Sequence, residues 1–380
     1  MRRIRNLALF GIAAAAVLIG LAFVFRQQLQ PLLGVNVDAG GGGRAELAVP
    51  DGYEAAVFAE GLRGPRFMAV GADGTVFVAE RGADRVIALP DADGDGIADE
   101  TLEVGTGYGS AHDLAFEEDG SLLVAGQETL WRVVLDGLRE ASREVIVEAL
   151  PTGGHSTKSL AVLPSGEILL SIGSSCNVCD EEDRRRATVQ LVTDDGLRPY
   201  MVGLRNAVGL WVDPATGRAW ATNMGRDLLG DDLPPETLYG LVDGADAGWP
   251  RCHAGSLPDP EFGDAVDACE GVASPATTFP AHTAPLDLVG WDDSVFVALH
   301  GSWNSSVKVG YAVWRIPWGA GGPTGDPEPF ATGFLPDGAD AARGRPAGLA
   351  VGDDGAVYVS DDKAGFIYRI VLTDPSSGAG

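Results

Sequence analysis

Beyond residue 45 the chain repeats one pattern of hydrophobic and polar positions. Each copy contains a small apolar stretch, a polar turn, and a strand in which apolar residues alternate with others. Alternation on both sides of a two-residue turn predicts a β-hairpin. The pattern occurs six times, with turns at Gly74, Gly120, Gly166, Gly217, Asp293 and Gly355.

The spacing of these turns indicates the fold. They are 46, 46, 51, 76 and 62 residues apart, and hairpins that recur at such intervals are typical of propeller blades. We therefore predict an all-β fold, a six-bladed β-propeller. The long intervals before the fifth and sixth turns predict inserted loops over one face. An eight-stranded sandwich is the alternative fold, but it leaves the repeat unexplained.

The N-terminus has a different pattern. Three arginines precede an uncharged, mostly apolar run of 19 residues, 7–25. As a helix this run would span roughly 28 Å, close to the thickness of a bilayer core. No clear cleavage site follows it. We predict that residues 1–35 are an uncleaved membrane anchor whose run 7–25 forms a single transmembrane helix; a cleaved signal peptide is the alternative.

This segment sets the expected location of everything that follows it. Arginines on the short side favour a cytoplasmic N-terminus. We therefore expect a membrane-anchored protein with its main domain on the periplasmic or extracellular side, or secretion if the segment is cleaved. Residues 36–46 contain four consecutive glycines and are expected to be a flexible linker. Residues 47–375 would form the propeller domain.

Charge and cysteines narrow the partners and the compartment. The net charge is −27, so the surface repels nucleic acid and anionic lipid, and we expect membrane contact through the N-terminal helix only. Four cysteines outside the cytoplasm indicate two disulfides. If each cysteine pairs with the one nearest to it in the sequence, the disulfides are Cys176–Cys179 and Cys252–Cys269. The second C-x-x-C of a zinc site is absent from the sequence.

One polar position recurs in every blade, eight to twelve residues before the turn, where the chain enters the innermost strand. It holds cations and imidazoles: Arg66, His112, His155, Arg205 with Asn206, His282 and Arg345. In a six-bladed propeller these side chains meet at the mouth of the central channel. A positive cluster in an acidic protein points to an anionic ligand. The alternative is the ordinary polar lining of a channel.

His155 has a distinctive setting among these residues. It follows Gly153 and Gly154, which leave room for a substrate to approach closely. An imidazole in such a place is suited to act as a base near neutral pH. A nucleophile elbow of the G-x-S-x-G type is absent from the sequence, so serine-hydrolase chemistry is not indicated.

Six segments in order carry a family resemblance: GGHSTKSL, LRNAVGL, GRDLLGDDLPPETLYGLVDGADAGWP, AHTAPL, HGSWN and GRPAGLAV. Together, over roughly residues 47–372, the chain resembles the exported PQQ-dependent sugar dehydrogenases, which include sorbosone, soluble glucose and fungal pyranose dehydrogenases. The resemblance implies a quinoprotein that oxidises a sugar or sugar aldehyde by hydride transfer to PQQ, pyrroloquinoline quinone, with Ca²⁺ beside it. Electrons would leave to a separate carrier, because a haem-binding C-x-x-C-H motif is absent from the sequence.

The resemblance also implies roles for individual residues. His155 would be the base that takes the hydroxyl proton, and Arg205 would polarise the quinone carbonyl or orient the substrate. The cofactor would be bound by Asn206, His282, Arg343 and Arg345, and Ca²⁺ by the backbone carbonyls of Gly248 and Pro250.

Two departures from the family pattern concern the site. The soluble glucose enzymes carry an aspartate where this chain has Ser174, and relatives often have an arginine where it has Ser305. Serine can accept a hydrogen bond from an imidazole but cannot stabilise its cation by charge. We therefore expect a weakened or altered activity.

Other interpretations stay open at this point. A calcium-dependent lactonase or esterase on a six-bladed propeller would need Asp, Glu and Asn side chains that converge on a metal. A non-catalytic propeller would bind a sugar or a protein. Separately, DADGDGIADE at 91–100 resembles a calcium loop but has Leu102 at its twelfth position; it is either a weak structural calcium site or a solvated acidic turn.

Overall fold

The structure is a computed structural model that describes residues 42–264, 267–339 and 341–373. The predicted transmembrane helix within residues 1–35, and most of the predicted linker, lie outside the described residues. Within the described part, no helix is long and apolar enough to cross a membrane; its one helical element is the 3₁₀ turn η3 (Arg81–Ala83). At the end of the predicted linker, Ala45 is buried and its N–H donates to Tyr368 Oη at 2.8 Å.

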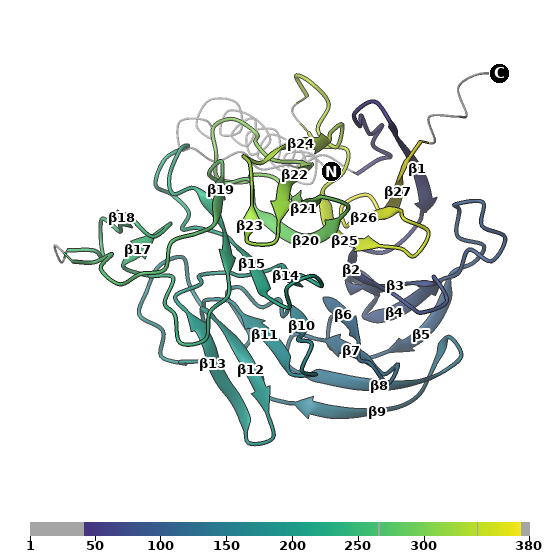
Figure 1. The fold of residues 1–380 in the computed structure, drawn as a ribbon, viewed down its shortest axis with the longest axis horizontal. Helices are drawn as coiled ribbons and strands as arrows, with labels where there is room; N and C mark the ends of the chain where they lie inside the picture. Colours follow the sequence, from purple (N-terminus) through teal and green to yellow (C-terminus); the bar gives the residue numbers. More distant parts are fainter. Residues whose placement is uncertain (1–41, 265–266, 340, 374–380) are drawn as a thin grey trace, which may run out of the picture.

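Six antiparallel sheets surround a central axis, as Figure 1 shows. The fold is therefore the predicted six-bladed propeller. Blade 1 contains β2 (Pro65–Val70), β3 (Val76–Glu80), β4 (Arg85–Leu89) and β5 (Leu102–Thr106). Blade 2 contains β6 (Asp113–Phe116), β7 (Leu122–Ala125), β8 (Leu130–Asp136) and β9 (Arg139–Val147). Blade 3 contains β10 (Leu160–Val162), β11 (Ile168–Ile172), β12 (Thr188–Thr193) and β13 (Gly196–Val202).

The remaining blades are less regular. Blade 4 contains β14 (Leu210–Val212), β15 (Ala219–Asn223), β16 (Glu236–Gly240) and β19 (Thr277–Phe279). Blade 5 contains β20 (Pro285–Trp291), β21 (Ser294–Leu299), β22 (Ala312–Gly319) and β24 (Glu328–Ala331), with the short β23 (Gly322–Pro323) paired to β22. Blade 6 contains β25 (Pro346–Val351), β26 (Val357–Asp361), β27 (Phe366–Leu372) and β1 (Tyr53–Ala59).

The last blade closes the ring. Its outer strand β1 comes from the start of the domain and pairs antiparallel with β27 from the end of the chain. Strands from the two ends of the domain therefore share one sheet, and backbone pairing between β1 and β27 closes the ring. The hairpin repeat did not predict this closure, because a repeat reports local pairing only.

The six predicted turns all lie between the first and second strands of their blades. Five carry a glycine with positive φ, for example +83° at Gly74 and +75° at Gly355, a conformation that glycine adopts without steric cost. In blade 5 the left-handed residue is Asp292, at φ 54°; aspartate is among the few other residues that tolerate it. One face of the ring therefore carries the hairpin turns.

The opposite face carries the loops that enter each first strand and leave each second strand. This follows from the hairpin itself, since an antiparallel pair begins and ends at the same edge. Apolar packing between neighbouring blades holds these loops in place: Phe77 and Val86 of blade 1 pack in one buried cluster with Leu114 and Val124 of blade 2.

Two buried aspartates also connect blades near the axis. Asp113 of blade 2 accepts hydrogen bonds from the N–H groups of Leu114 and Leu160, at 2.7 and 2.8 Å. Asp287 of blade 5 accepts in the same way from Leu288 and Leu349, both at 2.8 Å. Each carboxylate thus joins the innermost strands of two adjacent blades.

Residues 241–276 form an insertion between β16 and β19. The insertion passes along β13, the outer strand of blade 3, and reaches the face that carries the loops entering each first strand. It runs parallel to the end of β13, with a bridge between Val202 and Asp246, and Trp249 N–H donates to the Gly203 carbonyl at 3.1 Å. The insertion continues into a small hairpin, β17 (Cys252–His253) and β18 (Leu257–Pro258). The disulfide Cys252–Cys269 closes it, and the second predicted pair, Cys176–Cys179, is also confirmed.

Candidate active site

His155 lies on the loop that enters blade 3, and Ser174 fixes its orientation. The imidazole Nδ1 is 2.9 Å from Ser174 Oγ and 3.2 Å from the Ser174 carbonyl oxygen. Ser174 Oγ donates its own hydrogen to the Cys176 carbonyl, at 2.7 Å. Both neighbours of Nδ1 are therefore acceptors, so Nδ1 carries the proton. Nε2 keeps its lone pair and has no hydrogen-bond partner within the described part of the chain, as a general base requires.

The same environment keeps this imidazole neutral. Burial, together with the positive charge of Arg205, lowers the pKa of His155 to about 4. At pH 7 the ring is therefore deprotonated at Nε2 and ready to accept a proton. An anionic ligand that neutralised Arg205 would move this pKa back upward.

Arg205 enters blade 4 with its guanidinium held on every side. Nε donates to the Asn177 carbonyl at 2.9 Å, Nη1 donates to the Gly225 carbonyl at 2.6 Å, and Nη2 forms an ion pair with Asp227 Oδ2 at 2.6 Å. The side chain is buried. It is a fixed positive charge beside His155 rather than a mobile one.

Asn206 is packed against His155 through the backbone of Gly173. A Cβ added at Gly173 would come within 2.5 Å of His155 Cβ and 2.7 Å of Asn206 Oδ1. Asn206 Nδ2 contacts Met224 Sδ at 3.5 Å, and its N–H donates to Asn223 Oδ1 at 3.1 Å. The structure therefore brings together His155, Arg205 and Asn206, as the sequence predicts.

A second polar cluster gathers residues of blades 1, 2, 5 and 6. Asp362 binds the Arg66 guanidinium through Oδ2 and His300 Nε2 through Oδ1, the latter at 2.9 Å. Arg345 Nε donates to the His300 carbonyl at 2.9 Å. Burial would raise the pKa of Asp362, but His300 and Arg66 lower it well below its ordinary value, so the carboxylate stays charged.

His112 lies beside Arg66 with one nitrogen unpaired. Arg66 Nε donates to His112 Nδ1 at 3.3 Å, so the proton of the neutral ring is on Nε2. Burial and then Arg66 lower the pKa of His112 well below its ordinary value, which keeps the ring neutral. Its Nε2 is buried with no hydrogen-bond partner among the described residues. A buried donor of this kind suits an oxygen of a bound ligand.

The other predicted residues have different surroundings. His282 Nε2 is 2.7 Å from the Gly230 carbonyl, so this ring ties the blade 4 rim loop to blade 5. Arg343 has a half-exposed side chain, and its ion-pair partner is Glu46 at 4.0 Å, outside both clusters. Two residues further on, Arg345 points into the second cluster.

The predicted calcium ligands fit only in part. The Gly248 carbonyl accepts two backbone hydrogen bonds, from the N–H groups of Arg251 and Cys252, both at 2.9 Å. A carbonyl oxygen has two lone pairs, so this one is not open to a metal. Pro250, whose peptide bond to Trp249 is cis, lies in the same turn.

Comparison with known proteins identifies the family. A family model described as TrAA12-like matches residues 47–233 and 257–373. The chain belongs to this family. It is the family of PQQ-dependent sugar dehydrogenases and AA12 pyranose dehydrogenase-like six-bladed propellers.

Individual relatives are distant. A pyrroloquinoline quinone-dependent pyranose dehydrogenase of Coprinopsis cinerea is 25% identical, and the alignment covers 86% of this chain and 55% of that protein. The chain thus spans little more than half the length of the curated relatives it matches.

Solved structures show the same fold. The holo PQQ domain of the Coprinopsis cinerea pyranose dehydrogenase has a TM-score of 0.76 at 23% identity and covers 87% of this chain and 98% of that one. The calcium structure of the Trichoderma reesei AA12 enzyme has a TM-score of 0.75 at 20% identity, with 89% and 99% covered.

In this TrAA12-like chain, sequence reasoning missed four residues that build the site. They all follow the second strand of a blade: Asn177, Asp227, His300 and Asp362. Counting back from each turn finds the loop that enters a blade, whereas these residues lie seven to eleven positions after the turn. Because a hairpin begins and ends at one edge, counting forward would have found them.

The carboxylates at the mouth bear on the lactonase interpretation. Asp227 accepts from Arg205 and, through Oδ1, from Asn304 Nδ2 at 2.7 Å, and Asp362 is occupied by Arg66 and His300. Both are thus used to hold cations in place. A hydrolytic metal site would need them free.

Two residues depart from the family pattern, at positions 174 and 305. Ser174 and Ser305 are both buried, and Ser174 makes the contact with the imidazole of His155.

In the acidic loop, oxygens of Asp91, Asp93 and Asp99 lie within 4.8 Å of one another. This loop joins β4 to β5, away from the loops that build the site.

Proposed function

We propose that this protein is an exported quinoprotein that oxidises a sugar or sugar aldehyde by hydride transfer to PQQ. The observation that carries the proposal is the geometry of His155: Nδ1 is fixed by Ser174, Nε2 is free, and the buried Arg205 lies beside it. A base with a fixed tautomer next to a fixed cation is suited to an alcohol that loses a proton as its oxygen gains charge.

The cations of the mouth suit PQQ as a ligand. PQQ carries three carboxylates, and Arg66, Arg205 and Arg345 supply positive charge in a protein whose net charge is −27. The unpaired His112 Nε2–H would donate to a cofactor oxygen. Bound there, the quinone would supply the hydride acceptor that side chains do not provide. The Ca²⁺ expected with it would need a ligand other than the Gly248 carbonyl.

His155 would take the hydroxyl proton at Nε2. The proton gives the ring a positive charge, and the Nδ1–H bond to Ser174 Oγ then strengthens because one partner is ionised. Arg205, which cannot move without losing its four hydrogen bonds to Asn177, Gly225 and Asp227, would hold the substrate or quinone oxygen in line. The inserted residues 241–276 would contribute to the choice of sugar.

The cellular setting belongs to the same proposal. Two disulfides are stable outside the cytoplasm, which supports export. Anchoring through residues 1–35 stays a prediction. A separate carrier would receive the electrons.

The test is cofactor binding followed by turnover. Purified protein is titrated with PQQ and Ca²⁺ by absorbance, then given a panel of aldoses and sugar aldehydes with a reducible dye. We expect one equivalent of quinone to bind and at least one sugar to reduce the dye. Binding without any turnover across the panel, or lactone hydrolysis without quinone, would contradict the proposal.

Arg345 and Arg343 form a matched pair for this titration. Arg345→Ala should weaken quinone binding about ten- to a hundredfold, because a charge-assisted hydrogen bond contributes roughly 1.5–3 kcal/mol. The geometry predicts a much smaller effect for Arg343→Ala, whereas the family resemblance predicts a loss in both. Unchanged titration of Arg345→Ala would remove Arg345 from the site.

A further inference from the structure

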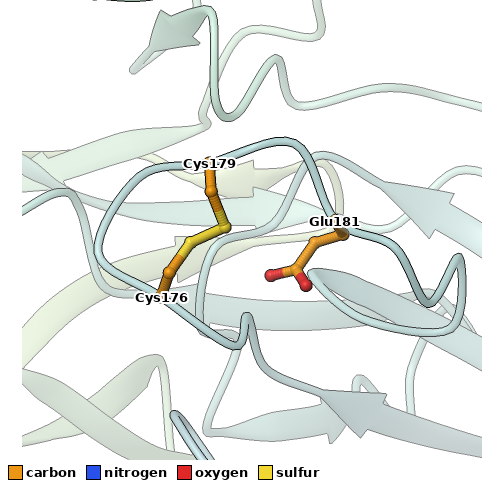
Figure 2. A group of neighbouring side chains, drawn as sticks. All are labelled: Cys176, Cys179 and Glu181. Carbon is orange, nitrogen blue, oxygen red and sulfur yellow. A yellow bond between two sulfur atoms is a disulfide. The ribbon is translucent and has the colours of Figure 1, made fainter.

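The disulfide Cys176–Cys179 closes a small ring on the loop between β11 and β12, at the edge of the candidate active site. Figure 2 shows the disulfide with the Glu181 carboxylate beside it. Glu181 accepts hydrogen bonds from the N–H and Oγ of Ser175, at 2.6 and 2.8 Å, so the residue that precedes the ring is also held in place. The two sulfurs are bonded to each other and are not thiolate ligands for a metal.

Inside the ring, Asn177 makes hydrogen bonds to two catalytic-site residues through both its backbone and its side chain. Its carbonyl accepts from Arg205 Nε at 2.9 Å, and its Oδ1 accepts from Arg205 Nη2 at 2.9 Å and from Asp227 N–H at 2.8 Å. Its Nδ2 donates to the Asp227 carbonyl at 3.0 Å. One residue of blade 3 thus fixes both the guanidinium of blade 4 and the carboxylate that pairs with it.

The disulfide-closed ring also helps to orient His155, the proposed base. The Cys176 carbonyl accepts from Ser174 Oγ, and that oxygen accepts from His155 Nδ1. Adjacent residues of one ring therefore connect to the imidazole on one side and to the guanidinium on the other. The main-chain carbonyls of Cys176 and Asn177 make two of these contacts, so the backbone conformation of the ring sets the geometry.

We infer that Asn177 is a positioning residue for Arg205, and that the disulfide-closed ring sets the placement of Arg205 relative to His155. This rests on the proposed function. The loop has no strand pairing inside the ring, so without the covalent closure its backbone would sample many conformations. Closure keeps the two carbonyls aimed at Arg205 and at Ser174.

The experiment uses the full chain loaded with PQQ and Ca²⁺, and compares Asn177→Ala, Asn177→Asp and the pair Cys176→Ser with Cys179→Ser. Val178→Ala, in the same ring, is the control. We expect kcat to fall about ten- to a hundredfold in Asn177→Ala, with KM much less affected. Asn177→Asp keeps an acceptor for Arg205 and should recover part of the turnover.

A second readout needs neither quinone nor sugar. The imidazole of His155 is titrated by NMR in the unloaded protein, where Arg205 contributes to its low pKa. If the ring holds Arg205 in place, the pKa of His155 should rise in Asn177→Ala and in the double cysteine variant, and stay as in the wild type in Val178→Ala. A general loss of folding stability would not by itself raise the pKa of His155 in these variants and leave it unchanged in Val178→Ala.

Reduction tests the ring in a protein that is already folded. A dithiol gives two electrons and two protons to the Cys176–Cys179 bond, becomes a cyclic disulfide, and leaves two thiols. Wild type should lose turnover under this treatment. The double cysteine variant should show no further loss of turnover when it is treated with the dithiol. A further loss in this variant would come from reduction of Cys252–Cys269, the other disulfide.

The inference is overturned if Asn177→Ala and the double cysteine variant keep both the wild-type kcat and the wild-type titration of His155. An equal loss in Val178→Ala would also overturn it. If the wild type binds no quinone and oxidises no sugar, the proposed function fails, while the NMR titration still decides whether the ring positions Arg205.

Discussion

The hydrogen bond between His155 and Ser174 allows a prediction about both rate and pH. Ser174→Ala removes the Oγ that accepts from Nδ1 at 2.9 Å and donates to the Cys176 carbonyl at 2.7 Å. The Ser174 carbonyl, at 3.2 Å from Nδ1, survives the change but is a poorer partner. The imidazole therefore loses its better acceptor, while the fold loses one small buried hydroxyl.

The magnitude follows from the difference between the two charge states of the ring. A neutral hydrogen bond contributes about 1 kcal/mol, and one to a charged group about 1.5–3 kcal/mol. The transition state, in which the ring gains a proton, thus loses roughly 0.5–2 kcal/mol more than the ground state. Turnover should fall about two- to thirtyfold, and the pKa of His155 should fall below its wild-type value.

The assay is the pH dependence of kcat/KM, which reports groups of the free protein. A base is active when deprotonated, and burial with Arg205 places the pKa of His155 at about 4. In the loaded protein the carboxylates of PQQ would offset Arg205 and move this pKa upward, so the acid limb of the wild-type profile should lie above pH 4.

Ser174→Asp gives the opposite shift and Ser175→Ala the control. A carboxylate beside Nδ1 stabilises the protonated ring, so the pKa of His155 rises and the acid limb moves to higher pH. Ser175 lies next in the chain, but its hydroxyl bonds Glu181 instead, so its removal should leave the limb in place. The reasoning is refuted if Ser174→Ala keeps full turnover, or if the limb in Ser174→Asp does not move upward.

Two further predictions test the base and the fold. His155→Gln should keep quinone binding and lose turnover by roughly 10²–10⁴; activity close to wild type in a stopped-flow assay would transfer the role to another histidine, with His300, paired to Asp362, as the next candidate. Asp287→Ala leaves the N–H groups of Leu288 and Leu349 without the acceptor they have now, so the free energy of unfolding should drop by about 2–5 kcal/mol; a denaturant midpoint equal to that of wild type would show that water replaces the carboxylate.

The sequence by itself determined what depends on local pattern. Alternating strands around glycine turns predicted six hairpins, and their spacing predicted six blades. Cysteines 3 and 17 residues apart predicted two local disulfides, which the structure confirms. His155, Arg205 and Asn206 were found because each enters an innermost strand, and that position is set within a single blade.

Tertiary structure decided what depends on contacts between blades. The outer strand of blade 6 comes from the start of the domain, and the insertion reaches the site by pairing with β13 of another blade. Arg343 and Arg345 are two residues apart, yet one pairs with Glu46 and the other donates to the His300 carbonyl. A repeat reports pairing within each blade, whereas these contacts form only when the ring closes and loops from different blades meet.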